Sequence, residues 1–142
     1  MLLMLQNIQQ NQNLYNRRWE ALIQVMSARS RNQFIKEKGL LEPFASLPKL
    51  FPGHPWVQPP HVEGVNIDVG GYQVGDNPPP GLVPANQDEF GVMKGLDVVD
   101  LRSRLRAIFW FYHDVRLSIP TNAMAWRCIQ GLKSLEMFLL HP

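Results

Sequence analysis

The chain has 142 residues, 45% of them hydrophobic, and a formal net charge of +2. A chain of this length usually forms one domain, so we expect residues 1–142 to form a single domain. So small a net charge does not by itself indicate a nucleic-acid-binding protein. The single cysteine, Cys128, excludes an intrachain disulfide and a zinc site closed by several thiolates. Such a chain suits a reducing intracellular compartment or the interior of a particle, and no motif indicates a cofactor.

Charge is unevenly distributed along the chain. Residues 1–50 carry seven Lys or Arg and three Asp or Glu, residues 51–100 carry one and seven, and residues 101–142 carry six and two. The acidic middle also holds eight prolines and eight glycines. Because charges act over about 8–10 Å at physiological salt, these local imbalances matter more than the total. Two basic ends around an acidic middle favour assembly with neighbouring molecules over a chemical reaction.

The first 41 residues predict an arm followed by helix. Residues 1–13 are rich in Gln and Asn, and we expect a loose arm or the frayed start of a helix there. Residues 14–41 are helical in pattern, with a second short helix over Gln33–Leu41 that Pro43 ends. At 100° per residue, one face of the main helix is apolar and is expected to join the core. It consists of Tyr15, Trp19, Leu22, Ile23 and Met26.

Residues 42–95 predict a long extended segment. Its prolines remove backbone donors and interrupt both helices and strand ladders. Apolar residues alternate with polar ones over residues 65–74 around Gly70-Gly71, which leaves room for one small β-hairpin. We expect this segment to wrap over the helices or over a neighbouring molecule, and we expect its part from Pro52 to Pro84 to become ordered mainly through contacts with a partner or with other copies.

Residues 96–142 predict a helical hairpin. One apolar face continues from Val98 through Leu101 and Leu105 to Tyr112, in a helix expected over residues 96–117. Pro120 interrupts it, and Thr121 or Asn122 can cap a second helix that reaches about Leu140. The fold class is therefore mainly α. We expect an N-terminal amphipathic helix and a C-terminal helical hairpin, with the long extended Pro/Gly-rich segment between them.

Arginines on the two basic ends are candidates for phosphate contacts, because a guanidinium binds phosphate through two hydrogen bonds. Arg18 and Arg29 share one helical direction, as do Arg102 and Arg106, so each pair could reach one nucleic-acid backbone. The alternative is that these side chains are solvated or pair with the acidic segment. The candidate nucleic-acid-binding residues are Arg17, Arg18, Arg29, Arg31, Arg102 and Arg106.

Apolar side chains outside the main stripes are candidates for a protein interface. Trp110 and Phe111 point away from the core face of their predicted helix, which implies either a partner or a third layer of the core. Trp56 gives the extended segment an aromatic group to bury, and the last helix ends in apolar residues. The candidate interface residues are Trp56, Trp110, Phe111, Phe138 and Leu140.

Catalytic and metal-binding readings are weaker. Cys128 with His113 and Asp114 could suggest a thiol hydrolase. However, Cys128 lies on an apolar stripe, and the other two are adjacent, so on a helix they point about 100° apart. His54, His61 and Asp68 could hold a metal ion, but their spacing matches no established motif.

The sequence thus predicts a non-enzymatic structural or assembly subunit of a larger complex, such as a capsid, nucleocapsid or organellar particle. It would interlock with other copies or other subunits through its extended segment and basic helices, and RNA is a further candidate partner. The alternative is an RNA- or DNA-binding protein, and a Cys-dependent hydrolase is the third reading. The apolar run Ala107–Tyr112 is far shorter than the about 20 residues of a membrane span.

Overall fold

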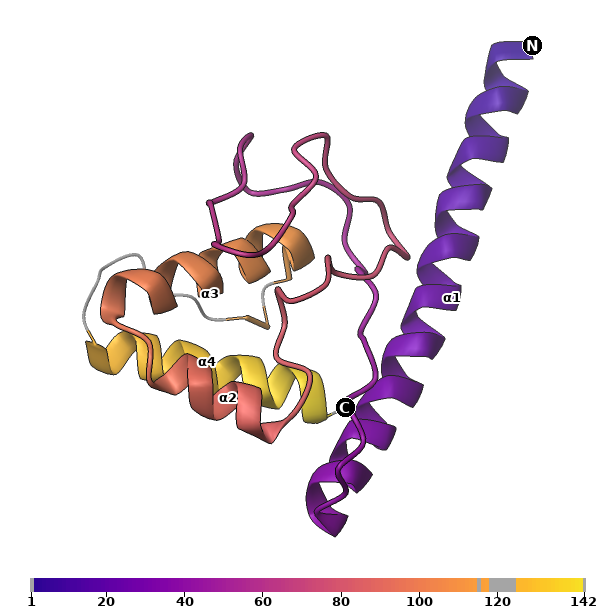
Figure 1. The fold of residues 1–142 in the computed structure, drawn as a ribbon. Coiled ribbons are helices and arrows are strands. Elements are labelled where there is room, and N and C mark those ends of the chain that lie inside the picture. Colours follow the sequence, from indigo (N-terminus) through magenta and orange to yellow (C-terminus); the bar gives the residue numbers. More distant parts are fainter. Residues whose placement is uncertain (1, 115, 118–124, 142) are drawn as a thin grey trace.

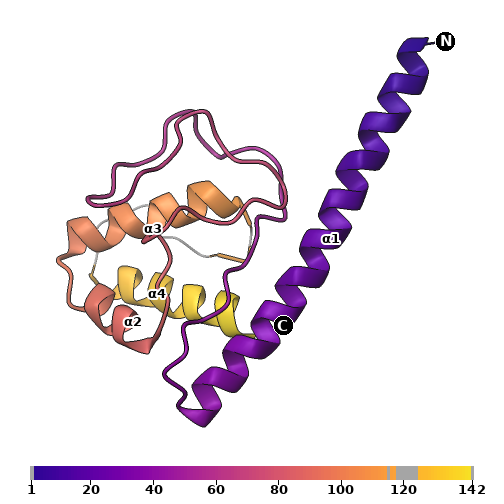
Figure 2. The same ribbon diagram turned by 45° about the vertical axis from the view of Figure 1, so that its right-hand side comes forward.

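The computed structural model describes residues 2–114, 116–117 and 125–141, and of residues 125–127 only the backbone. This part of the chain holds the helices α1 (Leu2–Lys38), α2 (Gln87–Lys94), α3 (Val98–Tyr112) and α4 (Ala125–Leu140), and none of its residues lies in a β-strand. The body of the molecule consists of α2, α3, α4 and segment 39–86. Helix α1 stands against one end of this body and projects beyond it (Figures 1 and 2). The prediction of a mainly α protein is confirmed.

Helix α1 is longer than predicted. Residues 2–13 form the start of the helix, which agrees with the second of the two alternatives and not with a loose arm, and no second helix begins near Gln33. Between Leu2 and Lys38 the sequence contains neither proline nor glycine, so nothing interrupts the hydrogen-bond ladder. The helix ends where Gly39 adopts a left-handed conformation (φ 62°) and the Leu40 N–H donates to the Ile35 carbonyl. This is the usual glycine cap of a helix C-terminus.

A different face of α1 packs on the body from the one that the sequence predicted. The buried side chains of α1 are Ala21, Val25, Ala28, Arg29, Asn32 and Ile35. The apolar stripe from Tyr15 to Met26 instead faces solvent. The packed face holds small side chains next to polar ones, and these polar groups have specific partners in the body.

Those partners are the carbonyl groups at the C-terminal end of α4. Arg29 Nε donates to the Phe138 carbonyl (2.7 Å), and Asn32 Nδ2 donates to the Leu139 carbonyl (3.1 Å). The last carbonyls of a helix have no partner within it and carry the negative end of its dipole. Asn32 also donates to the Ala45 carbonyl (3.0 Å), so one buried amide joins α1, α4 and segment 39–86.

Helices α3 and α4 run in the same direction (Figures 1 and 2). Tyr112 at the end of α3 accordingly contacts Phe138 near the end of α4, with ring centroids 4.9 Å apart. The predicted helical hairpin is therefore not confirmed, because two helices of a hairpin run in opposite directions. The predicted caps Thr121 and Asn122 lie outside the described residues.

Helix α3 also ends earlier than predicted, at Tyr112 rather than near Leu117. Its C-cap His113 is left-handed (φ 48°), and the His113 N–H donates to the Phe109 carbonyl (2.7 Å). At the other end, the Asp97 side chain accepts a hydrogen bond from the Asp100 N–H and caps the first turn. The helix is buried on several sides, as a central element of the core must be.

Segment 39–86 crosses over α3 and returns (Figure 2). Its outgoing and returning parts meet where the Phe44 N–H donates to the Ala85 carbonyl and where Lys49 exchanges backbone hydrogen bonds with Gly75 and Asp76. The small β-hairpin is not confirmed, since the described residues 65–74 form turns and irregular structure. The segment is held by its own chain, with Leu47, Val74 and Leu82 buried in the core.

This segment also caps the C-terminal end of α3. Lys49 Nζ donates to the Phe111 carbonyl, and His54 Nδ1 donates to the Trp110 carbonyl (2.8 Å). The Tyr112 hydroxyl returns a hydrogen bond to the Leu47 carbonyl (2.8 Å). The third layer that covers α3 is therefore the chain's own irregular segment.

The sequence prediction did not include helix α2, since it assigned an extended segment as far as residue 95. Asn86 caps α2 by accepting from the Glu89 N–H (2.9 Å), and the Glu89 carboxylate accepts from the Ala85 N–H. A short polar residue followed three positions later by Glu is a known helix-start signal, and it was present at these positions. Phe90 and Met93 then enter the core.

We expect Asn32→Ala to lower the free energy of unfolding by about 2–3 kcal/mol, because it leaves buried carbonyls of α4 and segment 39–86 without a donor. The matched control is Ser30→Ala, on an exposed position two residues away. Urea denaturation measures both. Equal midpoints for the two variants would contradict the role of Asn32.

Candidate functional site

The most unusual surface of the molecule is an apolar face on α1. Its seven large side chains have exposed fractions between 37% and 69%, and the two aromatic ones are among the most exposed. We call this set the exposed face of α1: Leu5, Ile8, Tyr15, Trp19, Leu22, Ile23 and Met26. Contiguous apolar surface of this kind marks an interaction site in soluble proteins.

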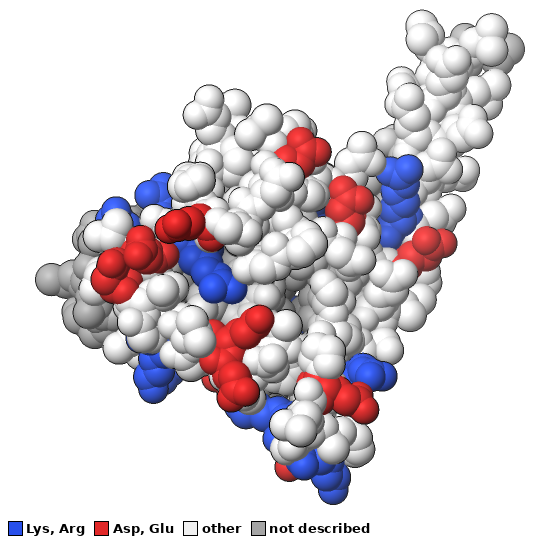
Figure 3. Space-filling model, viewed as in Figure 1, with Lys and Arg blue, Asp and Glu red and all other residues white. Residues whose placement is uncertain are grey.

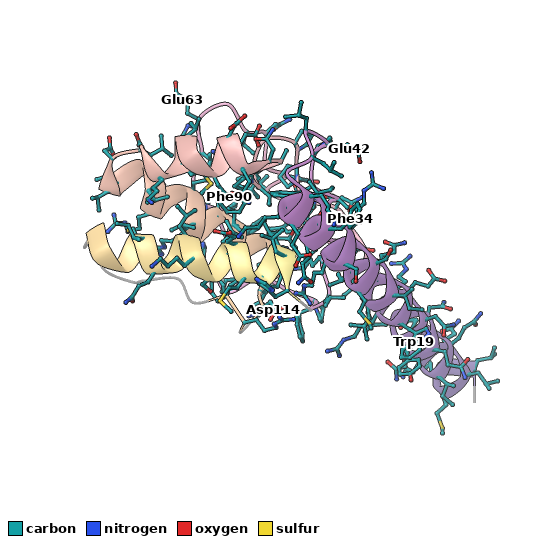
Figure 4. The ribbon with its side chains drawn as sticks, turned by 90° about the horizontal axis from the view of Figure 1, so that it is seen from below. Trp19, Phe34, Glu42, Glu63, Phe90 and Asp114 are labelled. Carbon is teal, nitrogen blue, oxygen red and sulfur yellow. The ribbon has the colours of Figure 1, made fainter. Side chains whose placement is uncertain are left out.

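The position of α1 explains the exposure. From Leu2 to Glu20, none of its residues is buried. At 1.5 Å per residue, residues 2–16, which precede the first side-chain contacts with the body, extend for about 22 Å beyond those contacts. Trp19 lies on the part of α1 that stands clear of the other helices, whereas Phe34 lies close to them (Figure 4).

The projecting part of α1 is also uncharged. Residues 2–16 contain no Lys, Arg, Asp or Glu, and this end of the molecule is white in Figure 3. The first charged side chains, Arg17 and Arg18, contact the body: Arg17 donates to the Gln73 side chain (2.8 Å), and Arg18 lies over the Phe51 ring (4.9 Å). Over residues 2–16 the exposed face is therefore bordered by neutral side chains.

The candidate interface residues lie elsewhere. Trp110, Phe111, Phe138 and Leu140 are buried inside the chain. Trp110 stacks on His54 (3.9 Å between ring centroids) and donates from its indole to the Trp56 carbonyl (2.8 Å). Trp56 is half-buried under the Arg106 guanidinium (5.0 Å). The described contacts of these five candidate interface residues are within the chain. Segment 39–86 folds over α3 despite its prolines and covers Trp110.

The arginines proposed to bind nucleic acid are not brought together. Arg29 is buried over the Phe138 ring (4.9 Å), so the proposed pair of Arg18 and Arg29 does not form one surface. Burial, and next the charge of Arg116, lower the pKa of Arg29 to about 10. Arg31 pairs with Glu42 (2.9 Å). Of the six candidates, Arg102 and Arg106 remain together as half-exposed residues of α3.

His54 is occupied by the backbone rather than available to a metal ion. Its Nδ1 donates to the Trp110 carbonyl, and its Nε2 accepts from the Tyr72 N–H (3.0 Å), so the neutral ring satisfies both nitrogens. Asp68 accepts from the Gly70 N–H in a local turn (2.9 Å). Within the described ranges no three His, Cys, Asp or Glu residues are arranged to hold a metal ion.

The proposed thiol hydrolase residues are also apart. Cys128 is fully buried in the hydrophobic core. His113 lies at the exposed end of α3 near the Pro52 carbonyl (3.4 Å), and buried Asp114 accepts from the Arg116 N–H (2.9 Å). A nucleophile needs an accessible sulfur next to a base. These three residues do not provide that arrangement.

One cleft of about 490 Å³ lies between residues 61–63 and α3. Its lining includes His61, Glu63, Asp100 and Ser103, which are residue types used in hydrolysis. Among the described contacts, however, no hydrogen bond joins Ser103 to His61 or His61 to a carboxylate. The neighbouring Asp97 carboxylate raises the pKa of Asp100 above its ordinary value. Arg104 also lines the cleft, so its charges are mixed, and the described contacts form no catalytic relay there.

Neither protein-family models, nor curated proteins, nor solved structures give a match to this chain. Across the described residues, none of the helices is both long and apolar enough to cross a membrane. The exposed face of α1 is therefore the candidate functional site, on the strength of its own geometry.

We expect the protein to lose stability as the pH falls below 6.5. Burial lowers the pKa of His54 below this ordinary value in the folded state, so the unfolded chain binds a proton first. The destabilisation should grow until the pH reaches the folded-state pKa and then level off. Urea denaturation between about pH 8 and about pH 5 measures it for the wild type and for His54→Gln. An identical pH dependence in the two proteins would contradict this role of His54.

We expect Cys128 to be unreactive in the folded protein, because thiol reagents need an exposed sulfur. A chromogenic disulfide reagent should titrate one thiol per chain in denaturant and none without it. Cys128→Ala should remain folded, with a loss on the order of 1 kcal/mol in the free energy of unfolding. Rapid titration of the native protein would show that the sulfur is accessible and would reopen the hydrolase reading.

Proposed function

We propose that this protein is a non-enzymatic structural subunit of a larger assembly, and that α1 connects it to neighbouring subunits. The observation that carries the proposal is the exposed face of α1, on a helix that extends beyond its own body. A capsid, a nucleocapsid or an organellar particle is the kind of assembly that uses such a connector.

Energetic reasoning supports a protein partner for this face. Full burial of one large apolar side chain contributes about 1.5–3 kcal/mol. Seven such side chains on α1, with a comparable surface on the partner, can exceed the about 4–15 kcal/mol that association costs. Helices in proteins also depend on tertiary packing more than on intrinsic propensity. A partner would thus supply the packing that the body does not give to residues 2–20.

The other two readings have less support. RNA or DNA binding rests on Arg102 and Arg106, because the remaining candidate arginines are dispersed or engaged within the chain. A hydrolase would need Cys128 to reach solvent from the core. Neither reading accounts for the exposed face of α1.

We expect the wild-type chain to have a mass in solution above the 16.3 kDa of one chain. The double variant Tyr15→Glu, Trp19→Glu should become monomeric, because it places two charges in the face that associates. The control Gln10→Glu, Gln24→Glu adds the same charge to exposed positions on another side of α1 and should associate like the wild type. Multi-angle light scattering at several concentrations measures all three.

A wild-type chain that stays monomeric at high concentration, and that no other subunit recruits, would contradict the proposal. If the control loses association as well as the Tyr15→Glu, Trp19→Glu variant, association depends on the net charge of α1 rather than on its exposed face. The ultraviolet absorbance ratio shows whether nucleic acid co-purifies with the protein. Co-purified nucleic acid that is lost in the double variant Arg102→Gln, Arg106→Gln would favour the alternative function.

A further inference from the structure

We propose that two copies of this chain pair through residues 5–26 of α1 as a parallel, in-register coiled coil, with Gln12 of one copy facing Gln12 of the other. The inference rests on the proposed function and names the partner of the same surface. It is carried by the spacing of the exposed side chains, by the charges beside them and by the one polar residue among them.

The exposed side chains follow a heptad repeat. Going along α1, successive members are separated by three and then four residues, which is the pattern of a two-helix contact. The seam positions, alternating between the a and d positions of the heptad, are Leu5, Ile8, Gln12, Tyr15, Trp19, Leu22 and Met26. All seven are exposed in the single chain, and together they span about 33 Å of helix.

The surface reaches the lower limit of area for a specific pair. A buried Trp or Tyr covers about 150–250 Å², so Tyr15 and Trp19 with the four aliphatic seam residues offer several hundred Å² on each chain. Two chains would then bury on the order of 1,000 Å² in total, which is the lower limit for a specific protein interface.

The charges beside the seam suit an identical partner. The flanking e and g positions carry a single charged residue, Arg18, and the others are neutral: Met4, Gln9, Asn11, Asn16, Ile23, Val25 and Ser30. In a parallel pair a g residue faces the e residue five positions later in the partner, so Arg18 faces Ile23. Complementary charges at these positions select a different partner, and like charges exclude a second copy. Here neither signal is present, and two copies meet without repulsion.

Gln12 is the one polar residue of the seam, and its amide fits a copy of itself. A primary amide has both donors and an acceptor, so two facing Gln side chains can hydrogen bond to each other. This requires both helices to run in the same direction with the same register. In an antiparallel pair over residues 5–26, Gln12 would face the apolar region near Trp19 and would lack a partner. A single polar a position is a known means of fixing register in coiled coils.

The body does not block this pairing. It packs against α1 through Ala21, Val25 and Ala28 and reaches the flank of the seam at Val25 and at Arg18, which lies over the Phe51 ring, whereas the seam side chains themselves stay exposed. The projecting part of α1 is free of the body over most of the seam (Figures 1 and 4). A lipid surface is a less suitable partner, because residues 2–16 lack the Lys and Arg that attract anionic headgroups.

Oxidative cross-linking of the full chain tests the arrangement. In Gln12→Cys, two thiols of a parallel in-register pair lie across the seam, and mild oxidation should convert most of the protein into a disulfide-linked dimer. The matched control is Gln10→Cys, whose side chain is exposed but points away from the seam and should remain uncross-linked. The native Cys128 is present in both variants and is buried.

A spin label attached to Gln6→Cys provides a second measurement that leaves the seam intact. In a parallel pair the two labels lie at the same height. In an antiparallel pair position 6 lies opposite position 25, an offset of 19 residues or about 28 Å along the axis. The proposal predicts the shorter separation, measured by pulsed electron resonance.

The outcomes separate this inference from the proposed function. If the chain associates but does not cross-link at position 12, and the two labels lie far apart, the parallel pair is wrong. The proposed assembly function is then unaffected. A chain that is monomeric would overturn the parallel pair, and it would overturn the assembly function as well if no other subunit recruits the chain or if it binds only anionic vesicles. Dimers cross-linked at position 12 but not at position 10, with the short label separation, would support the proposal.

Discussion

The structure depends on how the C-terminal ends of two parallel helices are capped. Because α3 and α4 run in the same direction, the negative ends of both helix dipoles lie at the same end of the body. Lys49 and His54 donate to the last carbonyls of α3, and Arg29 and Asn32 donate to those of α4. These four side chains come from α1 and segment 39–86. The same contacts therefore satisfy the helix ends and attach α1 and the irregular segment to the helices.

This arrangement explains how the chain uses its basic residues. The two ion pairs among the described residues are Arg31–Glu42 and Lys36–Glu136. Arg29, Lys49 and Arg104 instead donate to backbone carbonyls. Burial lowers the pKa of Lys49 to about 8, which shows the cost of placing this cation at the end of α3. The basic ends and the acidic middle are thus joined mainly by backbone and ring contacts rather than by opposite charges.

Helix α1 serves two purposes on two sides. Its small and polar side, which includes Ala28 and Asn32, attaches to the body, where close approach and hydrogen bonding matter more than apolar area. Its large apolar side remains exposed and is the surface we propose for assembly. The contacts that attach α1 to the body do not involve the exposed side chains, so association through those side chains leaves the core contacts in place. A connector between subunits needs this independence.

The sequence by itself determined the mainly α class and the existence of an apolar face on α1, because 3.6-residue periodicity and the absence of Pro and Gly are local properties. It also predicted that Trp110 and Phe111 need cover, and the Asn86–Glu89 signal for α2 was present although it was not used. Only the tertiary structure decided that segment 39–86 covers Trp110 and Phe111 and that α3 and α4 are parallel. It also decided that the apolar face of α1 faces solvent. Periodicity defines a face but not what covers it. That depends on contacts between distant residues, such as Asn32 with Leu139, which no local pattern encodes.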